Sequence, residues 1–136
     1  MNGIDMEELL LKAFLAAEQA YVPYSKFRVG AALLCEDGRI FLGCNVENRS
    51  FGLTICAERT VVTKAVSEGC RSFQALAIAT PDSKTPVGPC GACRQVLSEF
   101  MPAEAPVRFG GASVERVDAT IGQLIPYDSL HDLGKA

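Results

Sequence analysis

TICAERT at residues 54–60 and PCGAC at residues 89–93 are the two stretches around which this chain is organised. Together they contain three cysteines, Cys56, Cys90 and Cys93. Three thiolates can hold a zinc ion and leave its fourth tetrahedral position open, as a catalytic zinc requires. We therefore expect these cysteines to bind one zinc ion per chain, with a water in the open position.

The spacing also predicts where the ligands lie. One helical pattern begins at Cys56 and another near Cys90, and a helix N-terminus favours the thiolate form because its N–H groups are unpaired. Cys90 and Cys93 are three residues apart, which places both sulfurs on one side of a first helical turn. Without Cys56, this Cys-x-x-Cys pair would fit a redox pair or half of a structural zinc finger about as well as part of a catalytic site.

Two charged residues follow the first ligand. Glu58 does not share the helix face of Cys56, but its side chain is long enough to reach a metal-bound water. We expect Glu58 to be the catalytic acid and base that moves the proton of this water. Arg59 does share the face of Cys56, and we expect its guanidinium to donate to thiolate sulfur and withdraw charge from the metal.

The other potential ligands are few. Cys35, Cys44 and Cys70 do not form a spaced pair, and we interpret them as small buried hydrophobic residues. His131 is the only histidine, which excludes a zinc site built on several histidines of one chain. Residues 1–8 carry acids and no base, unlike a secretory signal, so we interpret the six cysteines as cytosolic thiols or metal ligands.

Size and charge favour one cytoplasmic domain with a small substrate. The 136 residues are 49% hydrophobic and 21% charged, which suits one compact domain over residues 1–136. No apolar run approaches the roughly 18 residues of a membrane-spanning helix. The net charge is −3 and there is no basic run, which argues against a nucleic-acid partner.

Hydrophobic periodicity predicts a layered α/β fold. Helices are expected over residues 6–20, 56–69, 91–100 and 119–125, and strands over residues 27–35, 39–44, 73–80, 106–109 and 113–117. Apolar strands that alternate with helices are typical of a mixed sheet covered on both faces.

Four segments, in this order, resemble a known family: YSKFRVGAA (24–32), GCNVEN (43–48), CAERT (56–60) and PCGACRQV (89–96). They are similar to cytidine deaminases of the small homotetrameric class, in which three cysteines bind zinc, and the resemblance covers nearly the whole chain. It implies a three-layer α/β/α sandwich with a central mixed five-stranded sheet. It also implies zinc-dependent hydrolysis of cytidine and deoxycytidine to uridine and deoxyuridine with release of ammonia, a step of pyrimidine salvage.

The resemblance assigns roles to five further positions. By matched position, Phe27 would pack on the pyrimidine, and Asn45 and Glu47 would hold the ribose 3′-hydroxyl. The backbone N–H of Ala57 would bind O2 of the base. Phe51 matches an aromatic position of the loop after Asn45, in a family whose active sites are completed by neighbouring subunits.

A homotetramer is therefore implied, but the C-terminal tail departs from the family pattern. Residues 125–130 read IPYDSL and lack the phenylalanine that reaches into a neighbour's pocket in family members. Tyr127 is the candidate replacement, and the difference bears on substrate preference.

Three rival functions remain open at this point. The first is a deaminase of the same fold that acts on a modified cytosine nucleoside, such as a blasticidin-type antibiotic. The second is a deaminase of bases in nucleic acid, which the acidic balance disfavours. The third is a binding module with a structural zinc, which would need a fourth ligand such as Cys35, Cys44 or Cys70.

Overall fold

The structure, a computed structural model, describes residues 3–130 and 133 of the chain. Its helices are α1 (Met6–Ala17), η1 (Phe51–Leu53), α2 (Ala57–Ser67), α3 (Gly91–Ser98) and α4 (Ile121–Leu124). Its strands are β1 (Gly30–Cys35), β2 (Ile40–Cys44), β3 (Phe73–Thr80), β4 (Pro106–Gly111) and β5 (Arg116–Thr120). They form one five-stranded sheet in the order β2-β1-β3-β4-β5, in which only the β3–β4 pair is parallel. The predicted central mixed five-stranded sheet is confirmed.

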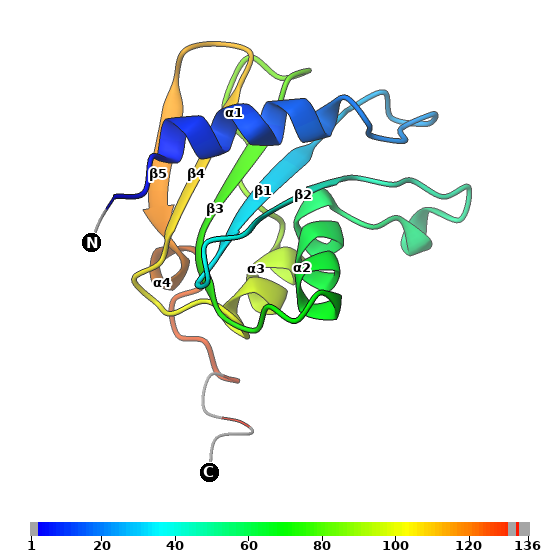
Figure 1. Ribbon diagram of the computed structural model, residues 1–136. Helices are drawn as coiled ribbons and strands as arrows, with labels where there is room; N and C mark the ends of the chain where they lie inside the picture. The colour runs from blue at the N-terminus through cyan, green and yellow to red at the C-terminus, as the bar shows by residue number, and fades with distance from the viewer. Residues whose placement is uncertain (1–2, 131–132, 134–136) are drawn as a thin grey trace.

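Helices cover both faces of this sheet, as predicted. α1 lies across one face, and α2 and α3 lie side by side on the other (Figure 1). The face under α1 is lined by small residues, Ala32, Ala75, Ala77 and Ala79, which let the helix approach closely. The opposite face carries larger side chains, including Leu33, Leu76, Ile78 and Val107. Alternation along each strand thus supplies two cores, one per face.

Two glycines allow the helices to touch the sheet backbone. A Cβ atom on Gly30 would lie 2.0 Å from the carbonyl oxygen of Ala13 in α1. A Cβ atom on Gly43 would lie 2.8 Å from the backbone nitrogen of Val61 in α2. The two glycines belong to the paired strands β1 and β2, so this edge of the sheet is held tightly between the layers.

Several boundaries differ from prediction for local reasons. α1 ends at Ala17 and not at Ala20, because Gln19 and Ala20 bond three residues back, to Ala16 and Ala17, and tighten the last turn. β1 begins at Gly30 and not at Phe27, since residues 27–29 bond mainly to side chains, and the backbone bond from the Asn45 N–H to the Val29 carbonyl lies beyond the end of β2. β5 begins at residue 116 because residues 113–115 form the preceding turn.

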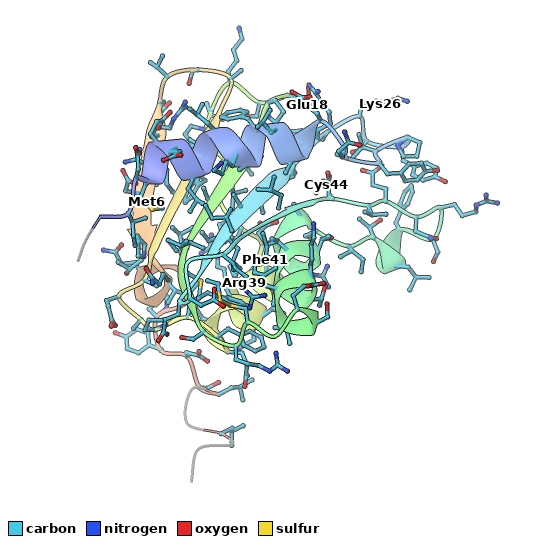
Figure 2. The ribbon with its side chains drawn as sticks, in the orientation of Figure 1. Met6, Glu18, Lys26, Arg39, Phe41 and Cys44 are labelled. Carbon is cyan, nitrogen blue, oxygen red and sulfur yellow. A yellow bond between two sulfur atoms is a disulfide. The ribbon has the colours of Figure 1, made fainter. Side chains whose placement is uncertain are left out.

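The prediction that all six cysteines are thiols or ligands is wrong for two of them. Cys35 at the end of β1 and Cys70 after α2 form a disulfide with a Cα–Cα distance of 6.2 Å. Both are buried, as predicted, but the fold brings them together across 35 residues of chain. Cys44 is free and half-buried. Near the disulfide end of α2, the Arg39 guanidinium lies over the Phe41 ring at 5.2 Å (Figure 2).

Candidate metal centre and active site

Two helix N-termini bring the three predicted zinc ligands together. Cys56 is the N-cap of α2 and Cys90 is the N-cap of α3, while Cys93 lies buried in the first turn of α3. The Cys56 and Cys90 sulfurs are 4.0 Å apart, and the Cys90 and Cys93 sulfurs are 3.4 Å apart. All three Sγ atoms lie within 4.8 Å of one another.

The sulfur cluster favours ionisation of Cys56 and disfavours that of Cys93. The pKa of Cys56 is lowered to about 5, chiefly by the hydrogen bond from Cys93, with further contributions from Arg59 and Cys90. The pKa of Cys93 is raised, chiefly because this thiol donates to Cys56 and also because it is buried. The cluster thus holds a thiolate at Cys56 beside a thiol at Cys93 that keeps its proton. A metal cation that replaces this proton would bind all three sulfurs.

Arg59 makes the contact that its position in the helix predicted. Its Nη2 atom lies 3.6 Å from the Sγ atom of Cys56 and 3.5 Å from the carbonyl oxygen of Thr54. The Cys56 thiolate raises the pKa of Arg59 further above its ordinary value. The guanidinium therefore offsets negative charge on a ligand sulfur.

Glu58 lies beside this cluster, away from solvent. Its side chain is 5% exposed, in the first turn of α2, and it lines a cavity of about 170 Å³ together with Cys56 and Cys90. The pKa of Glu58 is raised to about 7, chiefly by burial and also by the Cys56 thiolate, against the lowering effects of its own backbone N–H and of Arg59. A carboxyl group with such a pKa can take up and release a proton near neutral pH.

Ala57 and Asn45 line the same cavity. Ala57 is the first residue of α2, where backbone N–H groups lack partners within the helix. The Asn45 side chain accepts from the Val29 N–H at 2.9 Å and donates to the Phe27 carbonyl oxygen at 2.9 Å. An amide group has two donor hydrogens and two acceptor lone pairs, so half of its capacity is left for a ligand.

Glu47 and Phe51 line a second cavity of about 360 Å³, which shares Thr54 with the first. The Glu47 carboxylate accepts from the backbone N–H groups of Tyr24 at 3.0 Å and Ser25 at 3.1 Å, and from the Ser25 hydroxyl. The Ser25 hydroxyl is the main cause of the lowered pKa of Glu47. Phe51 is 72% exposed, with its ring centroid 5.6 Å from that of Tyr24.

Phe27 lies outside the lining of both cavities but is held next to them through Asn45. Sequence reasoning missed Thr80, whose hydroxyl is buried without a hydrogen-bond partner and which lines the first cavity at the end of β3. A polar residue that ends an apolar strand was the available signal. It also missed Asp82, described below, for which there was no local signal. His131 lies outside the described residues.

The cysteine cluster fits zinc. Zn–S bonds of about 2.3 Å in tetrahedral geometry place ligand sulfurs roughly 3.8 Å apart, and the observed 3.4 and 4.0 Å lie on either side of this value. Over residues 3–130, no histidine, carboxylate or further cysteine joins the three cysteines as a fourth ligand. Cys35 and Cys70 are bound to each other. The fold and this three-ligand cluster define a catalytic zinc enzyme, in which zinc held by the three cysteines would have its fourth position free for water.

Comparison with known proteins gives the family. Residues 4–108 match the family described as the cytidine and deoxycytidylate deaminase zinc-binding region. A cytidine deaminase of Sporosarcina psychrophila is 52% identical over 123 residues, which cover 90% of both chains. One of Halalkalibacterium halodurans is 50% identical over 90% of this chain and 92% of its own. The crystal structure of a Burkholderia pseudomallei cytidine deaminase superposes with a TM-score of 0.86 at 41% identity, covering 91% and 98% of the two chains.

This chain therefore belongs to the cytidine and deoxycytidylate deaminase family, and it is a zinc-dependent hydrolase. Its expected fold, cofactor and enzyme class are confirmed. The alternative of a modified-nucleoside deaminase is not favoured, because the relatives quoted above are cytidine deaminases. No helix of the described residues is long and apolar enough to cross a bilayer.

Proposed function

We propose that residues 1–136 form a single-domain, zinc-dependent enzyme that hydrolyses cytidine and deoxycytidine to uridine and deoxyuridine with release of ammonia. The observation that carries this proposal is the position of a buried carboxyl group, Glu58, in one cavity with Cys56 and Cys90 of the zinc cluster. The identities of 52% and 50% to cytidine deaminases support the choice of substrate.

The chemistry is divided between the metal and Glu58. When bound by Cys56, Cys90 and Cys93, zinc supplies a Lewis acid that makes water acidic near neutral pH. Glu58 takes the proton from the attacking water and gives it to N3 of the pyrimidine ring. After the carbon C4 has been attacked, Glu58 takes the second proton from the new hydroxyl group on C4 and delivers it to the amino group, which departs as ammonia. Burial of Glu58 brings its pKa close to the working pH, as this two-way transfer requires.

Four residues are proposed to bind the nucleoside. Ala57 presents its backbone N–H to O2 of the base, and Phe27 packs on the ring. Asn45 and Glu47 hold the 3′-hydroxyl of the sugar, which both donates and accepts. Asn45 and Glu47 can each still bind this hydroxyl, since their hydrogen bonds within the protein use only part of their donors and acceptors.

We propose that the enzyme is a homotetramer in which Phe51 reaches the active site of a neighbouring subunit. Three neighbouring apolar residues support an interface here, since Phe51, Leu53 and Ile55 are 72%, 65% and 41% exposed. The net charge of −3 supports a free nucleoside and not nucleic acid as the substrate. A cytoplasmic location stays a prediction, and it implies that the Cys35–Cys70 bond is open there, because that compartment keeps thiols reduced.

The decisive experiment follows the loss of cytidine absorbance with purified enzyme and with Glu58→Gln. We expect the substitution to lower kcat by about 10²- to 10⁴-fold while zinc stays at one per chain. Glu68→Gln, at the exposed C-terminal end of α2, is the matched control and should keep full activity. A zinc-loaded wild type without turnover would refute cytidine as the substrate, and full activity of Glu58→Gln would refute its catalytic role.

A further inference from the structure

Residues 27–29 precede β1 and are held by the side chains of Asn45 and Asp82, together with a backbone hydrogen bond from the Asn45 N–H to the Val29 carbonyl at 3.1 Å. The carbonyl of Phe27 accepts from Asn45, and the N–H of Val29 donates to Asn45, both at 2.9 Å. Between them, the N–H of Arg28 donates to the Asp82 carboxylate at 2.8 Å. Successive residues are therefore tied to two different parts of the chain. The position of Phe27 and Val29 depends on both.

Asp82 binds Arg28 more fully than a simple surface ion pair. Besides the backbone N–H, the Nε atom of Arg28 donates to Oδ2 at 3.0 Å and Nη2 donates to Oδ1 at 2.8 Å. A two-pronged pair of this kind is directional as well as attractive. The two side chains are 41% and 28% exposed. These hydrogen bonds from Arg28 lower the pKa of Asp82 to about 2.

Asp82 is itself firmly anchored. It is the second residue of the loop of residues 81–89 between β3 and α3, and the carbonyl of its neighbour Ser83 accepts from the Ala112 N–H, after β4, at 2.7 Å. The same loop provides Val87 and Gly88 to the lining of the 170 Å³ cavity, to which residues 27–29 contribute Val29. The Arg28–Asp82 pair therefore joins two segments that line the active site.

We propose that Arg28 and Asp82 are a positioning pair of the deamination site, which holds Phe27 and Val29 in register with the loop of residues 81–89. The pair touches neither the cysteines nor the catalytic carboxyl group, so it acts on nucleoside binding through the segments it joins. This inference rests on the proposed function.

The hydrogen bonds predict an unequal effect of removing the two partners. Asp82→Ala removes all three acceptor contacts and leaves the Arg28 N–H without its partner. Arg28→Ala keeps the backbone bond, and Asp82→Asn keeps one acceptor oxygen for it. We expect KM for cytidine to rise about tenfold in Asp82→Ala and about threefold in the other two variants. The value of kcat should stay within about twofold, because Glu58 and the metal ligands are unchanged.

Asp37 provides a matched control. It accepts from the backbone N–H of Arg39 at 3.0 Å and from its Nε at 2.9 Å, a similar arrangement on an exposed pair. Arg39 also bonds to the carbonyl of Glu68, at the opposite end of α2 from Cys56. The 11 residues of α2 correspond to roughly 16 Å of helix. Asp37→Ala should therefore leave KM and kcat unchanged.

The experiment measures KM, kcat, zinc content and unfolding midpoint for the wild type and these four variants. Higher KM in the order Asp82→Ala, then Arg28→Ala and Asp82→Asn, with unchanged zinc and kcat, supports the positioning pair. A wild-type KM in Asp82→Ala refutes it while the proposed function stands. Variants of Asp82 and Asp37 that differ in unfolding midpoint alone would also refute it. A wild type without turnover refutes the proposed function, and the pair with it.

Discussion

Reduction of the disulfide between Cys35 and Cys70 should lower the free energy of unfolding by several kilocalories per mole. The bond closes a loop with a sequence separation of 35 residues. In the chain-entropy model, such a loop restricts the unfolded chain by an amount worth about 3.8 kcal/mol at 25 °C. This is a large part of the roughly 5–15 kcal/mol that stabilises most domains. The loop holds β2, η1 and α2, and with them Asn45, Glu47, Cys56 and Glu58.

The measurement is equilibrium unfolding in urea, with and without a phosphine reductant, at a constant zinc concentration. For a slope of about 2 kcal/mol per molar urea, the loss corresponds to a midpoint lower by about 2 M. Alkylation of the denatured protein before reduction should label four cysteines, Cys44, Cys56, Cys90 and Cys93. The double variant Cys35→Ala/Cys70→Ala should unfold at the same urea concentration with or without the reductant.

Cys44→Ala is the matched control, because Cys44 is a free thiol outside the metal cluster. This variant should keep the full sensitivity of the wild type to the reductant. Equal unfolding free energies for oxidised and reduced wild type would refute the entropic argument. Six labelled cysteines in unreduced protein would show that the bond does not form under the conditions of purification.

Three further predictions concern the site and its surroundings. Arg59→Ala should keep zinc but slow turnover by about 10- to 100-fold, because the Cys56 thiolate loses its cation; an unchanged kcat would remove Arg59 from the mechanism. The pKa of Asp82 is about 2 in the folded chain, which is below the value of about 3.9 in the unfolded chain. The ionised Asp82 carboxylate therefore stabilises the fold above about pH 4, and this contribution is lost as the pH falls toward 2. Unfolding of Asp82→Asn across this range should lack that part of the pH dependence, and slopes equal to those of the wild type would contradict the assignment. Phe51→Ala should raise KM for cytidine without changing zinc content. Sedimentation of the wild type should give the mass of four chains, and a fully active monomer would contradict the shared site.

Much of the fold could be read from short-range patterns. The strand predicted over residues 73–80 has these bounds in the structure, and both helices that carry the cysteines begin within a residue or two of their predicted starts. These elements are defined by apolar residues at periods of two and 3.6 and by glycine or proline at their ends, which are local properties. The ligand set could be predicted for the same reason, since Cys56 and the Cys90–Cys93 pair each begin a helix.

Other features depend on where separate segments meet. The bonds by which the Asn45 and Glu47 side chains support residues 24–29 follow from how this segment passes the end of β2. Nothing in a polar loop distinguishes a side chain that faces a sugar from one that bonds to neighbouring backbone. The homotetramer and the roles of Phe27, Asn45, Glu47, Ala57 and Phe51 in binding remain predictions.

The sequence alone indicated the zinc ligands of this protein, three thiols at two helix starts, and placed Glu58 two residues after the first of them. Tertiary structure alone decided the Cys35–Cys70 bond and the Arg28–Asp82 pair. The physical reason is that neither pair belongs to a local pattern, whereas the three cysteines of the zinc site stand at helix starts. Residue spacing determines which side chains share a helix face, whereas contacts across 35 or 54 residues depend on strand register and helix packing.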